Sequence, residues 1–391
     1  MNVNFNGFDL IVILGVTQGL LYAGLLLTRY GQYASKRLLA LLLLVFSVLS
    51  AKILLHTLGL WQNPTLRYFP LAFDLTIQPL LYLYAIALTQ KQFRLRSHLV
   101  HFAPTLIFLL HAIVVYIQTQ TTDDLLQKDL IAEKLAFNRV KQIEDYLSVL
   151  SGIVYGYLSL RRLNQYRLWL FDTISDTSYP TYTWLRNVVI VSGGVCLLLT
   201  INIVLDAGLG FTTRYFLHWQ LFYVYLSGCI YYLAIMGYQQ PPFEVAFEAT
   251  STRSSENRTS IGLDIAQSRA IKSRLETALD QERVFLDPDL SLNSLADQLN
   301  VSPNVLSAVI NSEFGKSFRS LINERRVTEV THRLTDPTYQ HLSILGIALD
   351  SGFNSEASFY RVFKSITGVS PRQLAEQQAL KTRSKDSQKP I

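Results

Sequence analysis

Long apolar runs occupy the first 240 residues of the chain, whereas shorter patterns of helical period occupy the rest. A helix that crosses a bilayer needs about 20 mostly apolar residues, because each residue adds about 1.5 Å across a hydrocarbon core about 30 Å thick. Seven stretches approach this length: 8–28, 38–60, 69–90, 99–117, 146–160 with its flanks, 186–206 and 215–237. The pattern therefore predicts a seven-helix transmembrane bundle, whose fifth helix is short and has polar edges.

The charge balance changes where the apolar runs end. Residues 1–240 hold 17 Lys and Arg against 11 Asp and Glu, whereas residues 241–391 hold 18 of each sign. We expect a transmembrane sensor or anchor domain over 1–238 and a flexible linker over 239–262. The linker contains a run from Ser251 to Ser260 without one apolar residue. A helix over 263–284 follows, which connects the two halves or pairs with its copy in a dimer.

The basic residues of the short loops predict the orientation of the bundle, because Lys and Arg favour cytoplasmic loops. The loops after the first, third and fifth stretches carry nine of them: Arg29, Lys36, Arg37, Lys91, Arg94, Arg96, Arg161, Arg162 and Arg167. The alternate short loops carry only Arg67 and Arg214. This asymmetry predicts an outside N-terminus and a cytoplasmic C-terminus.

Polar side chains inside the predicted spans are the candidates for a ligand site, because such groups usually face the bundle interior. The candidates are Lys52, Asp74, Gln78 and Asn202, and the spans contain four further polar groups, His56, Asp206, His218 and Gln220. Lys52 and Asp74 are positioned for an ion pair between helices. A structural pair that locks two helices together and a ligand site are both open interpretations of these residues.

Segment 118–145 is too charged to cross a membrane, with four basic and six acidic residues. We expect an amphipathic helix on the outer face. It would cap the bundle, contact a ligand or only cover the loop.

No catalytic residue, metal or cofactor is predicted. Cys196 and Cys229 lie in apolar runs without metal-binding spacing. His98 and His101 are three residues apart, which permits metal binding, but the sequence places no third ligand beside them.

Residues 291–315 have the pattern of two short helices around a tight turn. Ser291 is placed to cap the first helix, and Ser302 caps the second, with Pro303 at its first position. Gly315 ends the second helix. Two such helices around a short turn form a helix-turn-helix.

The same arrangement returns about fifty residues later. Ser343 caps a helix, Gly352 makes a turn, Asn354 is expected to cap the next helix, and Gly368 ends it. A long apolar stripe over 318–334 predicts one connecting helix between the two motifs. A double motif bridged by one helix is more specific than either motif alone.

Residues 285–375 resemble the DNA-binding domain of the AraC/XylS family of bacterial regulators. The residues that carry the resemblance are Asp289-Leu290-Ser291-Leu292, Leu295-Ala296, Ser302, Leu306, Phe314-Gly315-Lys316-Ser317-Phe318, Asn323-Glu324, Gly352-Phe353-Asn354, Phe359, Arg361-Val362-Phe363-Lys364, Thr367-Gly368 and Ser370-Pro371. The layout of the chain is similar to the membrane-bound subgroup of this family, in which a multispanning domain comes before the DNA-binding domain. We therefore expect a double helix-turn-helix domain over 285–378 and a basic disordered tail over 379–391.

The resemblance implies that both second helices enter the major groove of DNA, where base edges are distinguishable. By position, the DNA-binding residues of the first recognition helix are Asn304, Ser307, Ala308 and Asn311. The stretch from Ser302 to Phe314 contains no Arg or Lys, which departs from many members and weakens direct readout by this helix. The second recognition helix offers Glu356, Ala357, Tyr360, Arg361 and Lys364. Phosphate contacts are expected from Lys364, Lys316, Arg319 and Arg372.

These patterns favour an all-α, multi-pass protein of the bacterial inner membrane, with the DNA-binding domain in the cytoplasm. We interpret it as a one-component transcription regulator that is controlled by a signal at the membrane domain, and not as an enzyme. The expected partners are sequence-specific double-stranded DNA, the lipid bilayer, RNA polymerase, a second copy of the chain and a signal ligand. The alternatives are a membrane enzyme or transporter with a fused regulatory DNA-binding module, and a constitutive DNA tether with a membrane anchor.

Overall fold

The structure is a computed structural model, and it describes residues 6–90, 93–176, 179, 181–209, 217–240 and 265–377. The chain divides into two compact units. The bundle unit comprises Met1–Asn164 and Tyr182–Phe247, and the C-terminal unit comprises Gln165–Thr181 and Glu248–Ile391. Most of the predicted linker (239–262) and the predicted tail (379–391) lie outside the described residues.

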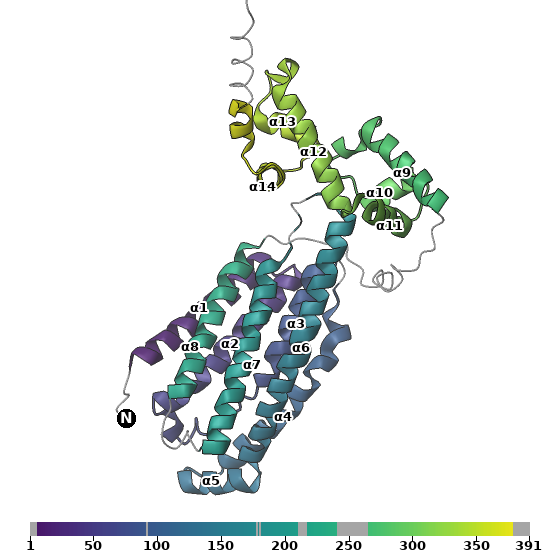
Figure 1. Cartoon of the computed structure of the whole chain (residues 1–391). Helices are drawn as coiled ribbons and strands as arrows, with labels where there is room; N and C mark the ends of the chain where they lie inside the picture. Colours follow the sequence, from purple (N-terminus) through teal and green to yellow (C-terminus); the bar gives the residue numbers. More distant parts are fainter. Residues whose placement is uncertain are drawn as a thin grey trace, which may run out of the picture. The chain divides into compact units, whose positions relative to one another are not determined.

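Every regular element in the described ranges is a helix, apart from one isolated β-bridge between Ile174 and Ser291. The predicted all-α class is confirmed. The bundle unit is built on α1 (Gly7–Tyr30), α2 (Ala34–Thr57), α3 (Ile77–Thr89), α4 (Ala103–Thr119), α5 (Leu125–Lys134), α6 (Phe137–Thr173), α7 (Thr183–Leu209) and α8 (Leu217–Gln239). Short 3₁₀ segments occur at η1 (Leu60–Gln62), η2 (Asp74–Thr76) and η3 (Leu95–Phe102). The long helices lie side by side, and α5 is a short helix at one end of the bundle (Figure 1).

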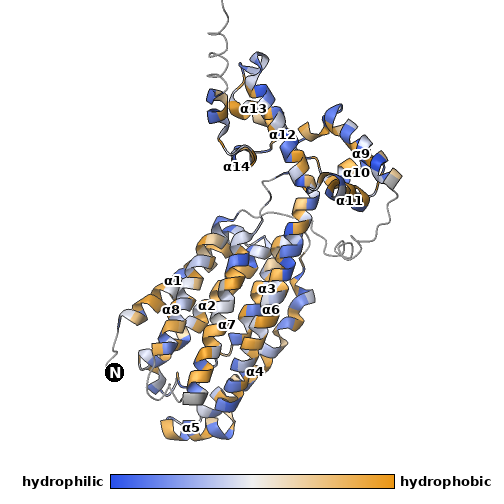
Figure 2. Cartoon of the chain, viewed as in Figure 1, coloured by the Kyte–Doolittle hydropathy of each residue, from blue (hydrophilic) through white to orange (hydrophobic). Residues whose placement is uncertain are grey.

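Five described helical segments are long and apolar enough to cross a membrane: Gly7–Tyr30, Ala34–Thr57, Leu95–Thr119, Thr183–Asp206 and Leu217–Gln239. Large apolar side chains stand exposed on them, among them Leu21, Ile107 and Leu197, each at least 60% exposed. Figure 2 shows apolar residues along the bundle helices. A water-soluble surface rarely carries so many such groups together, and a lipid environment accommodates them.

The predicted number of seven spans is not confirmed. α3 has only 13 residues, because the chain from Leu58 to Thr76 is irregular or 3₁₀ and the α-helix begins only at Ile77. α6 is long enough, with 37 residues, but charged side chains are distributed from its first turns to its last. It also extends well past the predicted fifth span and continues into the C-terminal unit.

Close approach of small residues joins α1, α2 and α8. A Cβ on Gly19 of α1 would lie 2.2 Å from Ser47 Oγ of α2 and 3.0 Å from Ile230 of α8, so a larger residue there would require these side chains to move. At the end of the same group, Lys36 is buried and its ammonium donates to the carbonyl oxygens of Gly237, at 2.8 Å, and of Gln240. The start of α2 is thereby fixed to the end of α8.

The C-terminal unit contains α9 (Ile265–Asp280), η6 (Val284–Leu286), α10 (Leu292–Gln298), α11 (Pro303–Phe314), α12 (Phe318–Thr335), η7 (Pro337–Tyr339), α13 (Ile344–Asp350) and α14 (Glu356–Thr367), and residues 371–377 are again helical. Its interior consists of two apolar clusters. Phe318, Leu321 and Ile322 of α12 belong to the first cluster, and Val327 and Val330 belong to the second. α12 is thus the predicted connecting helix, and it supplies core residues to both halves.

The helix ends follow the predicted capping residues in most places. The side chains of Ser291, Ser302 and Ser343 each accept a hydrogen bond from a backbone N–H in the first turn of the helix that follows. Gly315 and Gly368 end α11 and α14 with positive φ angles of 63° and 79°. These predictions are confirmed.

The predicted cap at Asn354 is wrong by one residue. Ser355 is the N-cap of α14, and its hydroxyl accepts a hydrogen bond from the backbone N–H of Ser358 at 3.3 Å. The side-chain amide of Asn354 instead donates to the carbonyl oxygen of Pro288 at 3.2 Å. Both residue types cap helices well, so the sequence alone did not separate them.

α9 packs on the C-terminal unit itself. Its stripe of Ile271, Leu275, Ala278 and Leu279 is buried in the first apolar cluster. Two roles were expected as alternatives for this helix: contact with the following domain, or pairing with its copy in a dimer. The packing fits the first role, because the following domain already covers the apolar stripe. The helix ends at Asp280 rather than near Val284, where the chain has turned into η6 after the positive φ of Arg283.

Candidate nucleic-acid interface

Two helix-turn-helix motifs stand at the two ends of α12. In the first, α10 and α11 are joined by a turn in which Asn300 adopts a positive φ of 48°. In the second, α13 and α14 are joined by a turn at Gly352, whose φ is 92°. α11 and α14 are therefore the two recognition helices, each with 12 residues.

The base-reading candidates on α11 lie on its outer side. Asn304 and Asn311 are exposed, and Ser307 and Ala308 are half-buried. The opposite side of the helix, formed by Leu306, Val309 and Ile310, is fully buried. α11 therefore presents small polar and apolar groups and no positive charge to a groove.

The corresponding candidates on α14 are all exposed: Glu356, Ala357, Tyr360, Arg361 and Lys364. Phe359 and Phe363 fix the opposite side of the helix in the second apolar cluster. Because α14 carries a guanidinium and an ammonium on its outer face, it has the stronger means of contacting guanine edges and phosphates. Contact with DNA by the individual side chains of α11 and α14 stays a prediction.

The phosphate candidates outside α14 differ in their surroundings. Lys316 and Arg372 are exposed and pair with Glu324 and Glu376 of their own segments. Exposed pairs of this kind are weak, about 0–1 kcal/mol, so a phosphate competes readily with them.

Arg319 differs from the other phosphate candidates, because it is only 6% exposed. Its Nε donates to the carbonyl oxygen of Ile174 at 2.8 Å, and its Nη2 donates to that of Asp176 at 2.6 Å. The guanidinium also lies 5.2 Å from the ring centre of Phe171. Burial lowers the pKa of Arg319 to about 10, which leaves it cationic at neutral pH. In this arrangement Arg319 is not free to contact a phosphate, and its partners lie about 145 residues earlier in the chain.

Arg326, which is 1% exposed, is not among the site residues predicted from the sequence. It donates from Nε to the carbonyl oxygen of Phe285 at 2.8 Å and from Nη2 to that of Asp287 at 2.6 Å. Its position within the apolar stripe of the connecting helix was the sequence signal that could have identified it as a buried arginine. Arg326 fixes α12 to the segment that leads into the first motif, and so it positions both recognition helices.

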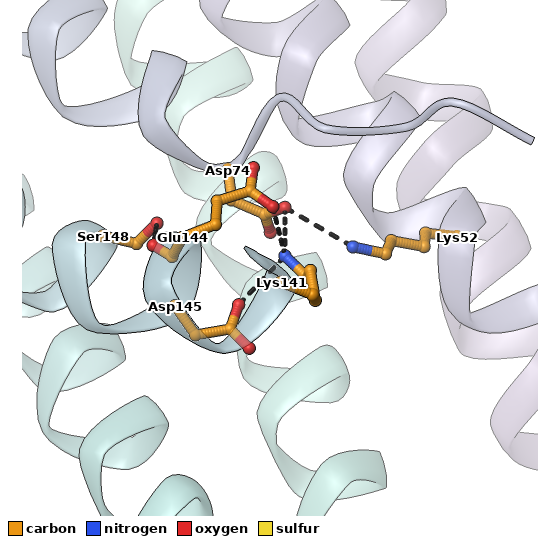
Figure 3. Close-up of polar contacts among 6 residues, drawn as sticks. All are labelled: Lys52, Asp74, Lys141, Glu144, Asp145 and Ser148. Carbon is orange, nitrogen blue, oxygen red and sulfur yellow. Dashed lines mark hydrogen bonds and ion pairs between the residues drawn. The ribbon is translucent and has the colours of Figure 1, made fainter. Parts of the chain in front are cut away.

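The bundle unit holds a second polar site, shown in Figure 3. Oδ2 of Asp74 accepts hydrogen bonds from Nζ of Lys52 at 3.4 Å and from Nζ of Lys141 at 2.8 Å. Lys141 also contacts Glu144 and Asp145, each at 2.9 Å. The predicted pair of Lys52 and Asp74 is therefore present, but it belongs to a five-residue charge cluster. Lys141, Glu144 and Asp145 were not predicted as members, because residues 118–145 were expected to form a helix on the outer face.

The other two ligand candidates have partners of their own. Nε2 of Gln78 lies 3.8 Å from Sγ of Cys196, and Nδ2 of Asn202 donates weakly to the carbonyl oxygen of His218 at 3.5 Å. No hydrogen bond or ion pair in the described ranges joins either residue to the charge cluster. His101, one of the two histidines at metal-binding spacing, is hydrogen-bonded to the hydroxyl of Tyr155 at 2.8 Å.

Comparisons with known proteins match the C-terminal unit. Residues 295–377 match the family described as "Helix-turn-helix domain". The chain is 33% identical to an uncharacterized HTH-type transcriptional regulator of Staphylococcus aureus (strain MSSA476) over 100 residues. This match covers 26% of the chain and 13% of the relative. The chain is also 30% identical to the melibiose operon regulatory protein of Escherichia coli (strain K12) over 87 residues. This match covers 22% of the chain and 28% of the relative. No solved structure matches the chain.

The fold and the matches together define a DNA-binding transcription regulator of helix-turn-helix type. Its C-terminal domain is of the AraC type, as the resemblance of the sequence predicted. Five described helices have the length and composition to cross a membrane, which fits a membrane-associated regulator. The matched domain is of a kind found in transcription regulators and not in enzymes. The chain spans only a small part of its relatives, so their own activities are not transferred to it.

Proposed function

We propose that the chain is a one-component regulator embedded in the bacterial inner membrane, which binds specific promoter DNA through α11 and α14. The observation that carries the proposal is the presence, in one chain, of membrane-length helices with apolar outer faces and a two-motif DNA-binding domain. A signal at the bundle unit controls DNA binding. We further propose that the protein acts with RNA polymerase and as a pair of chains on its DNA.

The contacts of the basic residues support a cytoplasmic C-terminus. Arg29 donates to the hydroxyl of Tyr238, and Lys36 donates to the carbonyl oxygens of Gly237 and Gln240. The first basic loop and the exit of α8 therefore lie at the same end of the bundle. Positive residues favour the cytoplasmic side, where DNA is found.

The charge cluster around Lys141 supports signal control at the bundle. Two cations and three carboxylates leave it with a formal charge of −1, and Oε1 of the buried Glu144 has no hydrogen-bond partner among the described residues. Ionisable groups inside a membrane domain are costly and are usually paired with one another. A signal that breaks these pairs changes the positions of α2, η2 and α6 relative to one another. For coupling, the signal has to interact unequally with the two arrangements.

Genome-wide mapping of the DNA bound by the full-length chain in cells tests the proposal. We expect discrete promoter sites, which disappear when Arg361 and Lys364 are replaced together by alanine. A parallel reporter fused after Ile391 should be active only in the cytoplasm. Uniform DNA occupancy, or a periplasmic reporter, would contradict the proposal.

A further inference from the structure

A surface on the C-terminal unit holds a short segment of chain that comes directly after α6. We call Ile174–Asp176 the docking segment; it belongs to the same compact unit as α9–α14. Ile174 forms a β-bridge with Ser291, the residue that caps α10. The hydroxyl of Ser175, which is fully buried, donates to the carbonyl oxygen of Leu290 at 2.5 Å.

One face of α12 supplies the side chains that hold the docking segment. Arg319, Asn323 and Arg326 are spaced by four and three residues, and each is at most 6% exposed. Arg319 donates to the carbonyl oxygens of Ile174 and Asp176, and Asn323 donates to that of Ser175 at 3.0 Å. Nη2 of Arg326 lies 3.3 Å from Oγ of Ser175. Every carbonyl oxygen of the docking segment is thus bound by a side chain of one helix.

The position of Arg319 connects this contact with DNA binding. Arg319 lies on α12, and α12 packs against both recognition helices, α11 and α14. A cation on this helix is suited to a phosphate of the bound DNA. The docking segment binds the donors of Arg319. It also contains Asp176, and Asp172 lies two residues before it in α6, so two carboxylates accompany the segment. Both effects oppose the approach of a phosphate.

α6 gives the docking segment a connection to the charge cluster. It is one uninterrupted helix from Phe137 to Thr173. Lys141, Glu144 and Asp145 lie in its first turns, and Ile174 follows its last residue. A shift or rotation of α6 that follows from a change in the cluster therefore reaches the docking segment.

We propose that the docking segment is an internal ligand of the DNA-binding domain, which occupies Arg319 and holds the domain in a state of low DNA affinity. The proposal rests on the proposed function of the chain as a regulator. Movement of α6 withdraws the segment, and Arg319 then contacts the phosphate backbone. The bundle thereby controls DNA binding through this loop, separately from the linker that follows α8.

A reversible cross-link tests the proposal in the full-length chain, reconstituted in lipid nanodiscs, with the native Cys196 and Cys229 replaced by alanine. Residues opposite each other in an antiparallel bridge have Cα atoms about 4.5–5.5 Å apart, which is within disulfide range. We therefore expect the pair Ile174→Cys and Ser291→Cys to oxidise readily. Oxidation should weaken binding to the mapped promoter DNA about tenfold, and a reductant should restore it. Failure to form the disulfide, or equal affinity in both redox states, would overturn the proposal.

A release variant gives the opposite result. Ser175→Tyr cannot fit at a fully buried position and should expel the segment, so that DNA affinity rises about tenfold. Ser273→Tyr, on an exposed position of α9, is the matched control and should leave affinity unchanged. Unchanged or weaker DNA binding by a folded Ser175→Tyr chain contradicts the proposal. Loss of all sequence preference in the parent chain would instead contradict the proposed function, so the two failures are distinguishable.

Discussion

Arg326 donates a hydrogen bond from Nε to the carbonyl oxygen of Phe285 over 2.8 Å, and Gly352 packs against both groups. A Cβ on Gly352 would lie 2.5 Å from that carbonyl oxygen and 2.8 Å from that Nε. The connecting helix, the entry to the first motif and the turn of the second motif therefore meet at one point. Because both motifs share this point, the spacing of α11 and α14 depends on it.

Replacing Arg326 by alanine should destabilise the C-terminal unit by about 3 kcal/mol, because buried carbonyl oxygens lose a charged donor. Hydrogen exchange of the full-length chain should show faster exchange along α12 and α13. The control is Arg325→Ala, which removes an exposed pair with Asp280 and should cost less than about 1 kcal/mol. Similar exchange rates in the two variants would contradict the assigned role of Arg326.

Gly352→Ala should destabilise the second motif by about 2–4 kcal/mol, because the new methyl group combines an unfavourable φ with backbone overlap. Gly368→Ala provides a matched control, since its φ is also positive but a Cβ there meets nothing within 4 Å. That variant should lose only about 1 kcal/mol. Thermal unfolding of both variants measures the difference, and equal losses would show that the contact with Phe285 and Arg326 is unimportant.

Arg361→Ala should reduce affinity for the mapped promoter by about 1–3 kcal/mol and relax the preference at one base pair. Lys364→Ala should weaken binding to all sequences alike and lower the salt dependence, as expected for a phosphate contact. Ser307→Ala on α11 should have a smaller effect, because that helix carries no cation. Titrations of promoter and scrambled DNA at several salt concentrations separate these outcomes. A sequence-independent effect of Arg361→Ala would remove it from base readout.

Lys141→Ala should destabilise the bundle unit by about 3 kcal/mol, because three carboxylates then share only Lys52. The double variant Lys141→Ala with Glu144→Gln should recover part of this loss by removing one uncompensated charge. Lys134→Ala, at an exposed position of α5, is the control and should change little. Unfolding in detergent, followed by tryptophan fluorescence, measures all three. No recovery in the double variant would contradict the electrostatic explanation.

The DNA-binding half was largely predictable because its signals are local. Ser302, Pro303 and Gly315 mark the ends of the 12-residue helix α11, and each acts through its own backbone neighbours. The error at Asn354 arose where two good capping residues are adjacent. Local rules determine which helices form, but not which of two equivalent residues begins one.

The contacts of Arg319 were not predictable, because they join α12 to a segment about 145 residues earlier. A cation near a recognition helix indicates phosphate binding, and only the fold shows that carbonyl oxygens already occupy its donors. The charge cluster was not fully predicted, for a related reason. Lys141 lies at the start of a 37-residue helix. Because the first turns of this helix are charged, the sequence pattern indicated a separate surface segment there.

The contact of Lys36 with the last turn of α8 bears on how this chain can be recombined with others. A chimeric receptor that joins this bundle to a foreign output domain after Gln240 retains both carbonyl oxygens that bind the ammonium. A junction placed before Gly237 removes them unless the foreign segment continues α8 as a helix, and a buried cation without acceptors is costly. The contact of Lys36 thus sets how much of α8 a transplanted bundle unit should keep.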